Sequence, residues 1–203
     1  MKRLFSVLVL AMLIALPLAA QAQPPAPPAA MPPTTMAAAQ AAPVGPTEPL
    51  SRVIFNGYNG IKRNLTESAA KVPEADYSFA PTKEVRNFAQ IFDHVANTQF
   101  SLCSAAKGEA NPNKEDFEKT ATTKAAVVKA LADSFAYCDT VYLTLTDAKA
   151  VELIKMGQNE SPRVGRLITN VAHDNEHYGN LVTMMRLKGM VPPSTERAQM
   201  PRK

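Results

Sequence analysis

Four long segments of this chain carry apolar residues at steps of three and four, the period of an α-helix with one buried face. They span residues 51–72, 85–107, 122–145 and 162–188. No stretch shows the strict alternation of a half-buried strand, and no internal repeat is visible. The sequence therefore predicts an all-α domain in which four helices surround one hydrophobic core.

Residues that start or stop helices set the borders of these segments. Pro73 cannot continue the first helix, and Thr82 is expected to be the N-cap of the second. Ser161 and Pro162 fit the cap and the first position of the fourth helix, which Gly189 ends. Between and after the helices we expect a polar crossover loop over 108–121, a short helical turn over 147–153 and a polar tail over 195–203.

The first 22 residues have the pattern of a cleavable export signal. Lys2 and Arg3 form a basic start, residues 4–19 are almost continuously apolar, and Ala20-Gln21-Ala22 fits the small-x-small cleavage site. The apolar run is too short, and wrongly flanked, for a transmembrane helix. We expect cleavage after Ala22 and a periplasmic or secreted product with no membrane span.

Prolines dominate the next segment, residues 23–49, which holds nine of them. Proline locks φ and removes a backbone donor, so neither helix nor sheet can propagate through such a segment. We interpret it as an extended spacer. The remaining residues, 50–194, have the size of one domain.

The charge balance argues against nucleic acid or a membrane surface as a partner. The whole chain carries a net charge of +4, and losing Lys2 and Arg3 with the leader lowers it to +2. The basic residues are scattered and tryptophan is absent. The sequence thus shows no basic patch of the kind that binds phosphate backbones or anionic lipids.

A pair of histidines in the fourth helix points to a metal. His173 and His177 are four residues apart, so their side chains lie one above the other on the same helical face. Two imidazoles so placed can bind one ion at about 2.0–2.1 Å. The one remaining histidine, His94, also lies mid-helix, and we predict that all three bind one metal. The alternative is that they are ordinary surface or core histidines.

Polar residues accompany the histidines along an otherwise apolar stripe of the fourth helix. Buried polar groups without partners cost about 1–3 kcal/mol each, so we expect them to support the site. Asn170 and Asn180 are the candidates for holding the outer nitrogens of the imidazoles. Asp93 and Asp174 each adjoin a ligand in sequence, which predicts that they turn away from the site.

Two other metal motifs fit the chain poorly. His173-x-x-Glu176-His177 matches the pattern of inverted zinc peptidases, but only Glu196 in the tail remains as a third ligand, and His94 would have no role. A ferritin-like site needs Glu three residues before its histidines, and no histidine of this chain has it.

Four motifs follow one another along the predicted domain. They are Tyr77-x-Phe79-x-Pro81, then His94, then His173-x3-His177-Tyr178-Gly179, then Arg186-Leu187-Lys188-Gly189-x-Val191-Pro192-Pro193. Together they resemble the DinB/YfiT-like superfamily over residues 50–194. Asn180 departs from the pattern, since the family typically has Gln at that place.

The resemblance implies a four-helix bundle of up-down-down-up topology with its metal between the second and fourth helices. It implies one divalent ion, most often zinc or nickel, on His94, His173 and His177. Parallel second and third helices would place Cys103 and Cys138 at depths that differ by only about 8 Å. A disulfide between them and two buried free cysteines both remain open.

The sequence leaves the reaction open. Some members of the family are thiol-dependent transferases or isomerases, so the resemblance implies a metal-dependent enzyme of transferase type with a small-molecule substrate. Three imidazoles leave a position open on the metal, and metal-assisted hydrolysis is therefore the other reaction type that we consider. The alternative is a non-catalytic binding or interaction module with a structural metal. No catalytic residue is assigned, and a homodimer is neither predicted nor excluded.

Overall fold

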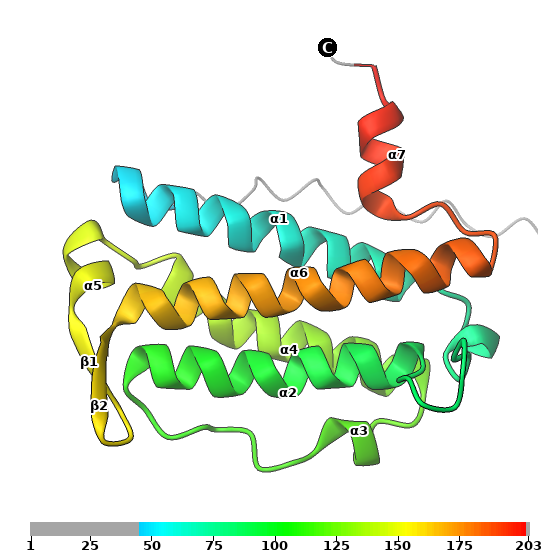
Figure 1. The fold of residues 1–203 in the computed structure, drawn as a ribbon, viewed down its shortest axis with the longest axis horizontal. Coiled ribbons are helices and arrows are strands. Elements are labelled where there is room, and N and C mark those ends of the chain that lie inside the picture. Colours follow the sequence, from blue (N-terminus) through cyan, green and yellow to red (C-terminus); the bar gives the residue numbers. More distant parts are fainter. Residues whose placement is uncertain (1–44, 202–203) are drawn as a thin grey trace, which may run out of the picture. The chain divides into compact units, whose positions relative to one another are not determined.

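The computed structural model describes residues 45–201, so the expected leader and most of the proline-rich linker lie outside the described residues. Four long helices lie side by side (Figure 1), and they confirm the predicted all-α class. They are α1 (Pro49–Lys71), α2 (Phe88–Lys107), α4 (Lys124–Tyr142) and α6 (Arg163–Leu187). Shorter helical pieces connect or follow them: η1 (Glu74–Asp76), α3 (Phe117–Thr120), α5 (Asp147–Val151) and α7 (Pro193–Gln199).

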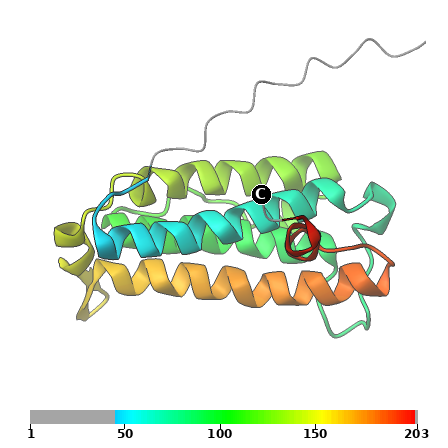
Figure 2. The ribbon, with the colours of Figure 1, turned by 90° about the horizontal axis from the view of Figure 1, so that it is seen from above.

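The long helices run in two directions. In Figure 1, α1 and α6 run from left to right, whereas α2 and α4 run from right to left. Because α2 and α4 share a direction, the segment 108–123 returns along the bundle and carries α3 with it. Seen from above in Figure 2, α1 lies between α4 and α6, and it contacts both. Helix α2 packs against α4 and α6 in turn.

Helix α2 begins later than the sequence predicts. Asn87, not Thr82, is its N-cap: the Asn87 side chain accepts a hydrogen bond from the Gln90 backbone N–H, and the Gln90 side chain accepts one from the Asn87 N–H. This reciprocal capping box satisfies two donors that the first turn cannot pair itself. Val85, expected on the apolar face, is 49% exposed.

A small hairpin precedes α6, although the sequence shows no strand pattern. Strand β1 (Leu153–Met156) pairs antiparallel with β2 (Asn159–Pro162), and Gly157 takes φ 66° in the turn. Pro162 pairs with Leu153 and caps α6, which starts one residue later than predicted. Strands of four residues are too short for alternation to stand out against loop sequence.

The predicted polar tail is largely a helix that docks on α1. Lys71 of α1 pairs with Glu196, and Arg197 pairs with Glu67. The Tyr178 hydroxyl of α6 donates to Ser194 Oγ at 2.8 Å. Ion pairs and hydrogen bonds hold α7 in place. Its sequence therefore needs no apolar periodicity of the kind that predicts the other helices.

A disulfide joins α2 to α4 inside an aromatic core. Cys103 and Cys138 are bonded, with Cα atoms 5.4 Å apart, and both are fully buried. Nearby, the rings of Tyr58 and Tyr142 stack at 3.8 Å between centroids. Among residues 45–201, no helix combines the length and the apolar character that crossing a bilayer requires.

The capping box predicts a clear difference between two single substitutions. Asn87→Ala should lower the free energy of unfolding by about 1 kcal/mol, because it disrupts the reciprocal hydrogen bonds that pair two backbone donors at the start of α2. Thr82→Ala changes the exposed residue that the sequence predicts as the cap of this helix, and it should leave the free energy of unfolding unchanged. Urea denaturation followed by circular dichroism measures both; equal losses would contradict the assignment of the cap.

Candidate metal centre

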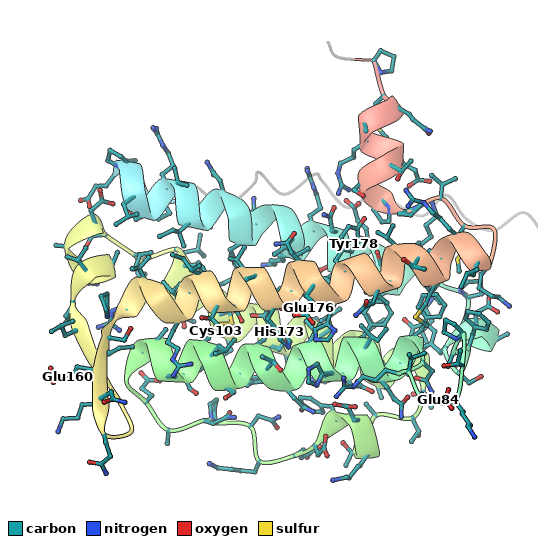
Figure 3. All side chains as sticks on the ribbon, in the orientation of Figure 1. Glu84, Cys103, Glu160, His173, Glu176 and Tyr178 are labelled. Carbon is teal, nitrogen blue, oxygen red and sulfur yellow. A yellow bond between two sulfur atoms is a disulfide. The ribbon has the colours of Figure 1, made fainter. Side chains whose placement is uncertain are left out.

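The packing of α2 against α6 brings three imidazoles together. His94 comes from α2, while His173 and His177 come from successive turns of α6 (Figure 3 labels His173). His173 Nε2 lies 3.1 Å from His94 Nε2 and 3.1 Å from His177 Nε2. All three ligand atoms lie within 4.8 Å of one another. Nitrogens about 2.0–2.1 Å from a tetrahedral ion lie about 3.3 Å apart, so this set can hold a metal.

The surroundings of His94 and His177 favour the neutral form of these two imidazoles, which is the form that binds metals. Burial, with the neighbouring His173 and His94 rings, lowers the pKa of His177 to about 4. Burial and the Arg86 guanidinium lower the pKa of His94, while Glu118 acts in the opposite direction. Protons therefore compete weakly for these two ring nitrogens at neutral pH.

A carboxylate that the sequence did not reveal orients His94. Glu118 of α3 places Oε1 3.0 Å from His94 Nδ1, and its Oε2 accepts a hydrogen bond from Arg86 Nε at 2.9 Å. A carboxylate on the outer nitrogen fixes the ring so that Nε2 faces the other histidines. The crossover loop reaches this position because Asn97 of α2 donates to Asp116 and accepts from the Phe117 N–H.

The two acidic neighbours of the ligands, which were expected to turn away from the site, are both buried. Asp174 is fully buried behind His173, where Oδ2 accepts from Gln99 Nε2 at 2.6 Å. Its Oδ1 lies 3.7 Å from His173 Nδ1, and neither atom has a hydrogen-bond partner within the described part of the chain. Burial raises the pKa of Asp174 to about 6. Asp93 is buried as well, which raises its pKa to about 7.

Asn170 and Asn180 do not take the roles that the sequence suggested. Asn170 is buried, and it donates to Gln99 Oε1 at 3.1 Å and to Tyr142 Oη at 3.3 Å. It therefore supports Gln99, which in turn contacts Asp174. Asn180 is exposed and lines a pocket.

A pocket of about 650 Å³ opens beside His177. Its walls come from the segment before α2, from the first turn of α2 and from the C-terminal half of α6: Pro81, Lys83, Glu84, Val85, Arg86, Gln90, Ile91, His177, Asn180, Thr183 and Met184. Glu176 is exposed outside this set (Figure 3), so the general base of the peptidase pattern is not in place.

Removing the carboxylate on His94 should weaken metal binding. Glu118→Ala leaves His94 Nδ1 without its partner, and zinc affinity should fall about 10- to 100-fold. Glu115→Ala, on the same loop, is the matched control and should keep the original affinity. Competition with a chromophoric chelator measures both; an unchanged affinity in Glu118→Ala would show that this contact does not orient the ligand.

Comparison with known proteins agrees with the fold. A DinB-like protein from Bacillus cereus superposes with a TM-score of 0.60 at 13% identity, covering 70% of this chain and 95% of that one. A DinB-like protein from Bacillus subtilis gives 0.52 at 16% identity, with coverages of 74% and 96%. The mycothiol-dependent maleylpyruvate isomerase gives 0.52 at 15% identity, with coverages of 64% and 60%. No curated protein matches.

The family model of the DinB superfamily matches residues 60–181, a range that spans α2, α4 and most of α6. All three histidines fall inside it. The match covers more than half of the sequence, and the chain therefore belongs to the DinB superfamily.

Proposed function

We propose that this protein is a metal-dependent enzyme that holds one divalent ion, zinc or nickel, on His94, His173 and His177. The observation that carries the proposal is the convergence of three imidazole Nε2 atoms, one of which belongs to His177 in the wall of a pocket. Because His177 belongs to both, a small molecule in the pocket can approach the ion. Volumes of this size are typical of small-molecule sites.

The protein's own residues prepare the site. Glu118 holds the ring of His94, and the buried carboxylate of Asp174 lies behind His173. A bound divalent ion supplies Lewis-acid chemistry, which activates water or a thiol or polarises a carbonyl. Three imidazoles leave at least one position for water or substrate.

Hydrolysis and thiol transfer are the two reaction types that fit such a site. Support for the thiol reaction comes from the similarity to the mycothiol-dependent isomerase. At 15% identity this is a similarity of fold. A location outside the cytoplasm, where low-molecular-weight thiols are scarce, favours hydrolysis. The alternative is a structural metal in a closed site. A closed tetrahedral site needs four protein ligands, whereas the candidate group among the described residues consists of three histidines.

Export is the second part of the proposal. The basic start, the apolar run over 4–19 and the Ala20-Gln21-Ala22 site support a cleaved leader. The buried Cys103–Cys138 disulfide also supports a location outside the cytoplasm, because such bonds persist in oxidising compartments.

Metal content tests the enzyme proposal at its first step. Purified protein should carry about one divalent ion per chain by plasma mass spectrometry, and His173→Ala should lose it. Glu176→Ala, on the same helix but exposed, should retain the full content. Wild-type protein that stays metal-free after incubation with zinc and nickel would overturn the proposal.

The leader makes a separate prediction. Protein recovered from the periplasm or the medium of a bacterial host should begin at Gln23, because cleavage follows Ala22. Intact-mass measurement checks this. A full-length chain confined to the cytoplasm would contradict export without bearing on the metal centre.

A further inference from the structure

We infer that the pocket beside His177 binds small organic anions, and that Arg86 holds their charged head group. This inference rests on the proposed function, since the head group would lie next to the metal ligands. It names the class of substrate: a carboxylate or a phosphate ester with a compact, partly apolar body.

Arg86 is linked to the histidine cluster through the carboxylate of Glu118. It precedes the N-cap of α2, and its Nε donates to Glu118, the same carboxylate that contacts His94. A guanidinium has five N–H donors, of which this contact uses the one on Nε. The remaining four lie on the two Nη groups, whose planar fork matches a carboxylate or a phosphate.

The charges around the pocket favour an anion. Lys83 and Glu84 pair with each other at 3.8 Å on the rim, and Arg86 pairs with Glu118. The charges of these four groups cancel. A divalent ion on neutral histidines would add two positive charges, of which the Asp174 carboxylate behind His173 would offset one. Lys83 is 91% exposed, and its charge is therefore screened by solvent. Arg86 is thus the better-placed cation for direct contact.

The remaining walls suit the rest of such a molecule. Gln90 uses its Oε1 in the capping box, and that contact does not involve its Nε2 donors. Asn180 and Thr183 add neutral hydrogen-bonding groups from α6, while Ile91 and Met184 provide apolar surface. An anionic head near Arg86 with a small ring or chain behind it would satisfy both kinds of wall.

Calorimetric titration of the zinc-loaded mature protein tests this, with benzoate, phenyl phosphate and neutral benzyl alcohol as probes. At least one of the two anions should bind more tightly than benzyl alcohol, and the better one indicates the head group. Arg86→Gln should weaken that binding about 10- to 100-fold, the usual effect of losing a charge-assisted contact. Arg86→Lys should fall between, because it keeps the charge and loses the fork. Arg52→Gln, at an exposed position of α1 outside the pocket, is the matched control and should bind as the wild type does.

Zinc content, measured on the same samples, separates the two proposals. Arg86→Gln should keep one zinc per chain. Zinc-loaded protein that binds neither anion, or binds benzyl alcohol equally well, overturns the anion inference and leaves the metal proposal standing. The same holds if Arg86→Gln keeps the wild-type affinity. Loss of zinc in Arg86→Gln also overturns it, since Arg86 would then act through Glu118 on the metal ligand. A wild type that binds no metal overturns the proposed function itself.

Discussion

The contact between α2 and α6 is the interaction on which the chemistry of this bundle depends. It brings His94 to His173 across 79 residues of sequence, and Gln99 to Asp174 across 75. Buried polar groups are tolerated only where a partner meets them, and here the partners come from the opposite helix. A shift of either helix by one turn, about 5.4 Å, would separate the imidazoles and leave a buried carboxylate alone.

Behind the histidines, the polar groups form a connected series rather than isolated pairs. Tyr142 and Gln99 each accept from Asn170, and Gln99 donates to Asp174, next to His173. Each bond in such a network restricts the next, although Asn170 Oδ1, Asp174 Oδ1 and His173 Nδ1 have no hydrogen-bond partner among the described residues. The side of the site facing the core is thus linked across three helices, whereas the side facing solvent consists of the segment before α2 and the exposed end of α6. That division suits a centre in which ligands stay fixed while small molecules exchange.

Helix periodicity and the histidine spacing were enough to predict the all-α class and the convergence of residues from α2 and α6. The prediction failed where local sequence carries little information. Thr82 and Asn87 both suit an N-cap, and only the return contact from Gln90 distinguishes them. Glu118 could not be linked to His94 because it lies in a polar loop whose path depends on contacts of Asn97. The expectation that Asp174 turns away from the site rested on helical angle alone, although a wide helix interface buries more than one narrow stripe.

The disulfide and the histidine cluster join α2 to different neighbours, α4 on one flank and α6 on the other. The disulfide spans 35 residues, whereas His94 and His173 are 79 residues apart. Loop-closure entropy grows with the logarithm of length, so a cross-link at the histidines would restrict the unfolded chain by about 0.7 kcal/mol more than one at the cysteines. A metal bound there would thus be a reversible counterpart of the covalent bridge, and its binding energy would add to the folding energy. The anchoring of α2 then depends on two properties of the surroundings, redox potential on one flank and metal supply on the other.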